Sequence, residues 1–109
     1  MNWVRGPSKQ HLQKERLKRE QKQKDIEDEA AHLLDGLKTA YEDLGHECIS
    51  LRRDRGYPIE MMEAENTRRA LILLRSKYPK HISFTETNGK EEGLGGYCDY
   101  SIFEVCYKN

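Results

Sequence analysis

Hydrophobic residues recur at helical spacing in the first half of the chain. Starting at Ile26, apolar side chains follow in steps of three or four residues: Ile26, Ala30, Leu33, Leu37, Tyr41 and Leu44. This spacing places them on one stripe and predicts a helix packed against a core. Traced backwards, the same stripe meets Gln23, Arg19 and Glu15, so the helix can continue without an apolar face. Gly45 suits the end of this helix, because glycine takes a left-handed backbone at little cost.

The middle of the chain predicts one strand and a second helix. The segment "HECISLRR" is expected to form a short strand, although Cys48 and Leu51 also stay in phase with the preceding helical stripe. "RRDRGYP" predicts a turn, and Pro58 is well placed in the first turn of a helix. That helix is expected to run from Pro58 to Lys77, and its predicted buried residues are Ile59, Met62, Ala70, Leu71 and Leu74.

The last third of the chain predicts a β-hairpin. "HISFTET" and "YCDYSIFEVCY" are rich in β-branched and aromatic residues, and "NGKEEGLGG" between them predicts a long mobile loop. The last strand is apolar at both odd and even positions, which is typical of a strand that is central or covered on both sides. The expected fold class is therefore α+β, in the order α-β-α-β-β, with a small sheet of about three strands that ends in a C-terminal hairpin.

Charged residues are sorted along the chain although its net charge is zero. Residues 1–24 hold eight Lys/Arg and two Glu, whereas residues 25–47 hold one Lys and eight acidic residues. The sign changes just before Ile26, where the apolar stripe begins. We therefore predict two parts, a basic helical arm over residues 1–24 and a small α+β domain over residues 25–109.

The basic arm is a candidate binding site. Six cations on a helix can meet an acidic partner or follow the phosphates of a nucleic acid, and they are Lys14, Arg16, Lys18, Arg19, Lys22 and Lys24. A solvated helix that only keeps the protein soluble explains the run equally well, because like-signed runs are common in tails. Trp3, the only tryptophan, is either an anchor for a partner or a residue that packs on its own domain.

Two further surfaces are candidates. On the last strand, one apolar row is expected to face outward and to bind a partner or form a homodimer. That row is either the one with Tyr97, Phe103, Val105 and Tyr107 or the one with Tyr100 and Ile102. A second basic patch, suited to nucleic acid, is expected from Arg52, Arg53, Arg55, Arg68 and Arg69, although ordinary solvated arginines explain these residues almost as well.

No sequence motif indicates catalysis or a cofactor. "GLGG", residues 93–96, matches neither the P-loop nor the dinucleotide fingerprint and is expected to be a hairpin loop. "HEC" places His46 and Cys48 on one side of a strand, but a Cys-His nucleophile also needs an orienting group and an oxyanion hole, which the sequence does not indicate. A Cys-dependent enzyme is therefore only the third hypothesis, and we expect no enzymatic activity and no cofactor.

Three cysteines are present, and their spacing does not suggest a disulfide framework. Cys98 and Cys106 lie about 26 Å apart if both are on one strand, because each residue adds about 3.3 Å. Neither a disulfide nor a shared metal ion spans that distance. The cysteines are therefore expected to be reduced and buried, and no metal site is expected.

The sequence favours a small non-enzymatic binding protein, an adaptor or inhibitor, that docks on a protein or nucleoprotein partner through its arm and its exposed sheet face. The alternative is a winged-helix-like nucleic-acid-binding protein that grips phosphates with the arm and the Arg52–Arg69 region; zero net charge weighs against it. In size, charge sorting and lack of catalytic motifs, the chain resembles small phage-encoded accessory proteins that bind and block a host factor. Without a signal peptide or a long apolar run, a soluble cytoplasmic protein with no membrane partner is expected.

Overall fold

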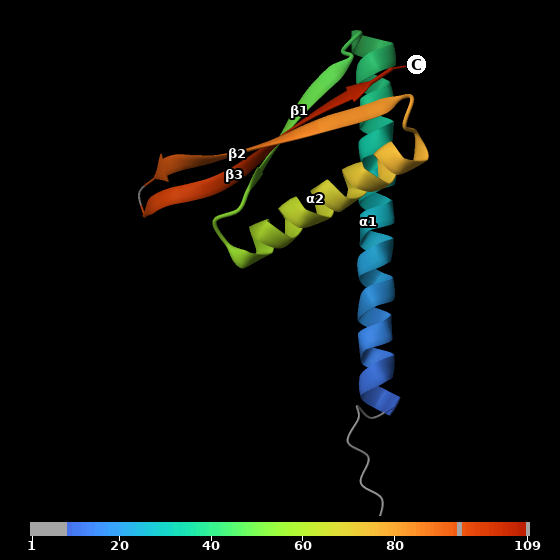
Figure 1. Cartoon of the computed structure of the whole chain (residues 1–109), viewed down its shortest axis with the longest axis vertical. Coiled ribbons are helices and arrows are strands. Elements are labelled where there is room, and N and C mark those ends of the chain that lie inside the picture. Colours follow the sequence, from blue (N-terminus) through green and yellow to red (C-terminus); the bar gives the residue numbers. More distant parts are fainter. Residues whose placement is uncertain (1–8, 94, 109) are drawn as a thin grey trace, which may run out of the picture.

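The structure, a computed structural model, describes residues 9–93 and 95–108. It contains two helices and three strands, in the order α1 (Lys9–Leu44), β1 (Cys48–Asp54), α2 (Pro58–Lys77), β2 (Ile82–Gly93) and β3 (Gly96–Tyr107). The predicted α+β class and the order α-β-α-β-β are confirmed, and "HECISLRR" forms a strand rather than a continuation of the first helix. In Figure 1 the sheet and α2 gather around the C-terminal half of α1, and the N-terminal half of α1 extends away from them.

The three strands form one antiparallel sheet in the order β1-β3-β2. Because β3 is central, its residue Phe103 lies opposite Leu51 in β1 and Glu86 in β2. The positions of β1 and β2 in the sheet are therefore both set by their pairing with β3. The last strand was expected to be central or covered on both sides, and it is central.

Both helices cover the same face of this sheet. Alternate side chains of β3 are buried, and they join one core cluster with residues of both helices: Ile26, Ala30, Leu33, Leu37, Ala70, Leu71, Leu74, Ile82, Phe103, Val105 and Tyr107. The apolar stripe predicted for α1 is thus buried from Ile26 to Leu37, while Tyr41 packs partly buried against the cluster and Leu44 is exposed. The opposite face of the sheet has no helix over it among the described residues.

The predicted buried face of α2 is only partly correct. Ala70, Leu71 and Leu74 are buried as expected, but Ile59 and Met62 are 62% and 54% exposed. Met62 lies two residues before the buried Ala64, about 200° away around a helix of 3.6 residues per turn. Ile59 shares the side of Ala70, but it lies in the first turn of the helix, before the first buried residue.

The predicted long loop of the hairpin is wrong. Strand β2 continues to Gly93, which pairs with Gly96 at the start of β3, so the connection between the strands is short. The "NG" at Asn88 and Gly89 does not form a turn, because Gly89 lies in the ladder opposite Tyr100. A Cβ atom at Gly89 would come within 2.5 Å of Cζ of that tyrosine, so this glycine makes room for the ring.

The N-terminal part of α1 forms an arm outside the core. Every side chain described from Leu12 to Asp25 is exposed, and Ile26 is the first buried one. Local pairs at i and i+4 support the helix here: Glu15 pairs with Arg19 at 3.6 Å, and Glu20 pairs with Arg16 at 3.1 Å. No helix in the described part of the chain has both the length and the apolar character needed to cross a membrane.

The domain is expected to fold without its arm. A protein covering residues 25–109 should keep a cooperative thermal transition within a few degrees of the full chain, because removing exposed residues costs less than about 1 kcal/mol. The shortened helix would also begin with Asp25, Glu27 and Asp28, whose charges favour a helix N-terminus. Calorimetry of both proteins measures this difference.

A second truncation that starts at Ala31 is the control. It also removes the buried Ile26 and Ala30, so its transition should fall well below that of the 25–109 protein. A molten or insoluble 25–109 protein would show that the arm belongs to the core.

Candidate functional site

The basic arm presents its cations to solvent. All six predicted residues are exposed: Lys14, Arg16, Lys18, Arg19, Lys22 and Lys24. Lys14, Lys18 and Lys22 follow one another at intervals of four residues, so they form a stripe along one side of the helix. Arg16 and Arg19 pair with glutamates of the arm itself, whereas none of the four lysines pairs with another side chain of the described ranges. Trp3 lies outside the described residues.

The structure does not gather the five arginines of the Arg52–Arg69 region into one basic patch. Arg52 lies on the uncovered face of the sheet, where it pairs with Asp54 and Glu91 and stacks 4.3 Å above the ring centre of Tyr100. Arg53 points to the helix side and donates a hydrogen bond to Thr67 at 3.1 Å. The charge of Arg52 is therefore largely compensated within the sheet.

The remaining arginines of this region lie elsewhere. Arg55 is in the connection between β1 and α2, and its buried Nε atom has no hydrogen-bond partner among the described residues. Arg69 is on α2 and pairs with Glu65 at 3.1 Å. Arg68 also pairs with Glu65, and it reaches from α2 to the sheet. Because these side chains point in different directions and most have acidic partners, they offer no continuous surface for phosphates.

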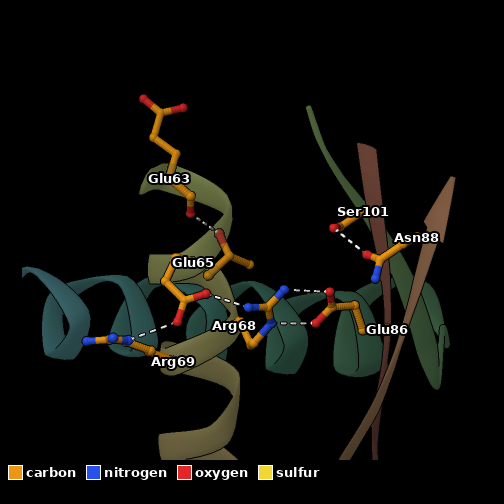
Figure 2. Close-up of polar contacts among 8 residues, drawn as sticks. Glu63, Glu65, Arg68, Arg69, Glu86, Asn88 and Ser101 are labelled. Carbon is orange, nitrogen blue, oxygen red and sulfur yellow. Dashed lines mark hydrogen bonds and ion pairs between the residues drawn. The ribbon is translucent and has the colours of Figure 1, made fainter. Parts of the chain in front are cut away.

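Arg68 of α2 and Glu86 of β2 form a bidentate ion pair between this helix and the sheet. The guanidinium donates two parallel hydrogen bonds to the carboxylate of Glu86 on β2, at 2.6 and 2.7 Å (Figure 2). Hydrogen bonds from Arg68 hold the pKa of Glu86 below its ordinary value of 4.5, although partial burial acts in the opposite direction. This pair joins the two elements with a geometry that lysine cannot reproduce.

Two buried hydroxyls complete the polar contacts under α2. Thr67 donates a hydrogen bond to the backbone oxygen of Glu63 at 3.0 Å, in addition to the one it accepts from Arg53. Ser101 of β3 donates to Asn88 of β2 at 2.8 Å (Figure 2). The sequence predicted no role for Glu86, Thr67 or Ser101. Ser101 alternates with the apolar Phe103 and Val105 on its strand, and Thr67 lies at helical spacing from Ala70 and Leu74.

The choice of Phe103 and Tyr107 as partner-binding residues is wrong. Phe103 is completely buried and Tyr107 is 8% exposed, because their row of β3 faces the helices. The outward row holds Ile102, which is half-buried, with Arg52 and Thr87 beside it on the neighbouring strands.

Two tyrosines near the turn of the hairpin remain reachable. Tyr97 is 73% exposed, so the structure leaves it available to a partner as predicted. Tyr100 shares the outward row with Ile102 and carries Arg52 over its ring. A partner that reaches the uncovered face would meet the row of Tyr100 and Ile102, not that of Phe103.

The expectation of three reduced, buried cysteines is also wrong. Cys48 and Cys106 form a disulfide, and only Cys98 is a free thiol, which is exposed. Cys48 begins β1 and lies directly opposite Cys106 near the end of β3, with their Cα atoms 4.0 Å apart. Cα atoms of opposite residues on antiparallel strands are usually about 4.5–5.5 Å apart, so strand pairing alone brings the two cysteines within reach of a disulfide. The expectation rested on the distance between Cys98 and Cys106 along one strand, whereas the disulfide joins Cys106 to a cysteine of the neighbouring strand.

The candidate catalytic groups do not assemble into an active site. The sulfur atom of Cys48 is bonded to Cys106, so it is not a nucleophile beside His46 in this structure. Asp99 and Glu104 are separated by an odd number of residues on β3 and therefore point to opposite faces of the sheet. The "GLGG" segment joins two strands, whereas a phosphate-binding glycine loop leads into a helix.

Replacing Glu86 by Gln is expected to lower the free energy of unfolding by about 1–2 kcal/mol at pH 7, because it removes two charge-assisted hydrogen bonds from a partly exposed pair. The folded-state pKa of Glu86 lies below 4.5, so its carboxylate stabilises the fold above that pH. This contribution is lost as the pH falls through the folded-state pKa. Urea unfolding of both proteins at neutral and acidic pH should therefore show a difference that disappears in acid.

Glu65→Gln is the matched control. It changes the more exposed partner of Arg68 and should cost less than about 0.5 kcal/mol, as exposed ion pairs usually do. Equal stability of Glu86→Gln and the unchanged protein at pH 7, or a difference that persists in acid, would contradict the assigned role of Glu86.

Comparisons with protein-family models, with curated proteins and with solved structures found no match to this chain.

Proposed function

We propose that the protein is a non-enzymatic binding protein, an adaptor or inhibitor, that docks on a protein or nucleoprotein partner. The arm of α1 and the uncovered face of the sheet are the two contact surfaces. The observation that carries the proposal is the exposed position of six cations on a helix that continues beyond the core. A helix without an apolar face, held away from its own domain, contributes little to the core and is free to meet a partner.

The two surfaces supply different parts of the binding free energy. Exposed ion pairs contribute about 0–1 kcal/mol each and mainly speed up association. Stable docking therefore needs an apolar contact as well, which the row of Tyr100 and Ile102 on β3 offers. A homodimer through this face is the competing use of the same residues.

The alternative function is nucleic-acid binding through the same arm. The exposed lysine stripe of Lys14, Lys18 and Lys22 favours it, because phosphate contacts need only positive charge and reach. Two features weigh against it. The arginines of the Arg52–Arg69 region do not form a second phosphate surface, and among the described elements α2 stands alone between β1 and β2, whereas a helix-turn-helix needs a pair of helices.

The proposed location is the cytoplasm. A disulfide is more typical of oxidising compartments, so the state of Cys48 and Cys106 in cells bears directly on this part of the proposal. The absence of enzymatic activity is likewise part of the proposal. It is supported by the engagement of Cys48 in a disulfide rather than in a catalytic pair.

Changing the six arm cations to Gln is expected to reduce partner recovery strongly while leaving the helix and the domain folded, because the arm side chains do not contact the core. The protein would be used as bait in a lysate of its source organism, with and without nuclease treatment. Loss of the captured partner after nuclease indicates nucleic acid, and unchanged capture indicates protein. Circular dichroism verifies that helicity is retained.

A variant with six acids of α1 changed to amides is the matched control, since it alters the same number of exposed charges on the same helix: Asp25, Glu27, Asp28, Asp35, Glu42 and Asp43. This variant should keep the partner. Direct titration with duplex DNA separates the alternatives further, because six phosphate contacts give a log-affinity slope of about −5 against log salt. A shallow slope contradicts the nucleic-acid alternative, and unchanged partner recovery by the Gln variant contradicts binding through the arm.

Ile102→Asp is expected to abolish docking or self-association through the sheet face while the monomer stays folded, because Ile102 points away from the core. Sedimentation and partner capture measure the two forms of association. Ser76→Asp on α2 adds the same charge away from this face and should change neither.

Phe103→Asp is expected to unfold the protein, since it places a charge in a completely buried position. Unfolding of this variant would show that the row of β3 with Phe103 forms the core. If Ile102→Asp also unfolds the domain, the outward row is needed for stability and the sheet face is not the docking surface.

A further inference from the structure

Three potential metal ligands lie together on the uncovered face of the sheet. The Sγ atoms of Cys48 and Cys106 and a carboxylate oxygen of Glu104 are all within 4.8 Å of one another. In the structure the two sulfur atoms are joined as a disulfide. Two thiols and a carboxylate, brought together by the register of the sheet, are a ligand set that proteins use for zinc.

The backbone fixes this arrangement independently of the disulfide. Pairing of β1 with β3 places Cys48 opposite Cys106 and Ser50 opposite Glu104. Glu104 lies two residues before Cys106, so both side chains point to the same side of the sheet. Breaking the sulfur–sulfur bond would leave the three side chains adjacent, because the strand pairing holds the backbone in place. The β1–β3 ladder has seven residue pairs, from Cys48 and Cys106 at one end to Asp54 and Tyr100 at the other.

We propose that the reduced protein binds one Zn²⁺ ion through Cys48, Cys106 and Glu104, and that formation of the disulfide releases it. In the reduction step a dithiol reductant transfers two electrons and two protons to the disulfide and becomes a disulfide itself. The protein then holds two thiols. Binding of Zn²⁺ by both sulfur atoms as thiolates releases those two protons to solvent. In the reverse step a disulfide oxidant accepts the two electrons of the zinc-bound thiolates, takes up two protons to become a dithiol, and Zn²⁺ is released.

The distances suit zinc once the disulfide is open. Zn–S bonds of about 2.3 Å and Zn–O bonds of about 2.0–2.2 Å place neighbouring ligand atoms of a tetrahedral site roughly 3.5–3.8 Å apart. The donor atoms already lie within 4.8 Å of one another, so side-chain rotations suffice. Three protein ligands leave one position for water or for a ligand from a partner, and thiolate ligands favour zinc over magnesium or calcium.

The third cysteine does not belong to this site. Cys98 lies eight residues before Cys106 on β3, about 26 Å away along an extended strand. It faces the same side of the sheet and is exposed, so it is a matched thiol without the neighbouring ligands. We therefore expect Cys106 to bind the metal and Cys98, on the same strand, not to bind it.

Titration with Co²⁺, a coloured substitute for Zn²⁺, tests this proposal on the full chain. The protein carries the substitution Cys98→Ser, which removes the third thiol. It is reduced with a phosphine, separated from excess reductant under oxygen-free conditions, and titrated with Co²⁺. One equivalent should produce a thiolate-to-cobalt charge-transfer band, and added Zn²⁺ should remove it. The oxidised protein should show no band. Cys48→Ser or Cys106→Ser should abolish it, and Glu104→Gln should weaken binding by about tenfold or more.

A second measurement does not depend on how the variants fold. In the reduced unchanged protein, Zn²⁺ should protect Cys48 and Cys106 from alkylation, as mapped by mass spectrometry, while Cys98 remains reactive. Absence of the band in the reduced protein would overturn the proposal. So would equal protection of all three cysteines, or a band that persists at full strength in Glu104→Gln and in either serine variant.

Discussion

The packing of Phe103 and Val105 against the two helices is the contact on which the rest of the structure depends. Full burial of such side chains contributes about 1.5–3 kcal/mol each, and both are completely buried. Because they lie on the central strand, their orientation sets the register of both neighbours. A slip of one residue would turn Ile102, Glu104 and Cys106 toward the helices and Phe103 toward solvent. The uncovered sheet face and the cysteine pairing therefore follow from the same core contact.

Local patterns account for the elements that the sequence predicted correctly. The stripe from Ile26 to Leu37 repeats at helical spacing and is buried as expected, and Pro58 begins the second helix. Apart from the wrongly predicted face of α2, the failures involve contacts between distant parts of the chain. The role of Gly89 depends on the ring of Tyr100 across the ladder, and the outward row of β3 depends on where the helices pack. Cys48 and Cys106 are 58 residues apart and become neighbours only through strand pairing.

The sorting of charges follows the path of α1 from solvent to the core. Up to Lys24 the helix has no apolar face and carries the cations of the arm. The acidic block, the eight acids of residues 25–47, begins at Asp25, next to Ile26, the first buried side chain. The acids do not draw the arm back onto the domain. Asp25 accepts a hydrogen bond from Gln21 on the same helix, and Glu29 lies 3.9 Å from Arg53 of the sheet. Neither of these two acids contacts a cation of the arm, and the lysines of the arm remain exposed.

Zero net charge is compatible with electrostatic binding because the two signs are separated in space. Lys14 and Asp28 lie about 21 Å apart along a straight helix, at 1.5 Å per residue. The Debye length is about 8 Å at physiological ionic strength, so a partner near Lys14 is largely screened from the acidic block. Such a partner meets a local positive charge despite the neutral total. Near Asp25, by contrast, the acids lie within one Debye length of Lys22 and Lys24 and weaken their attraction, so the cations farthest from the domain dominate binding through the arm.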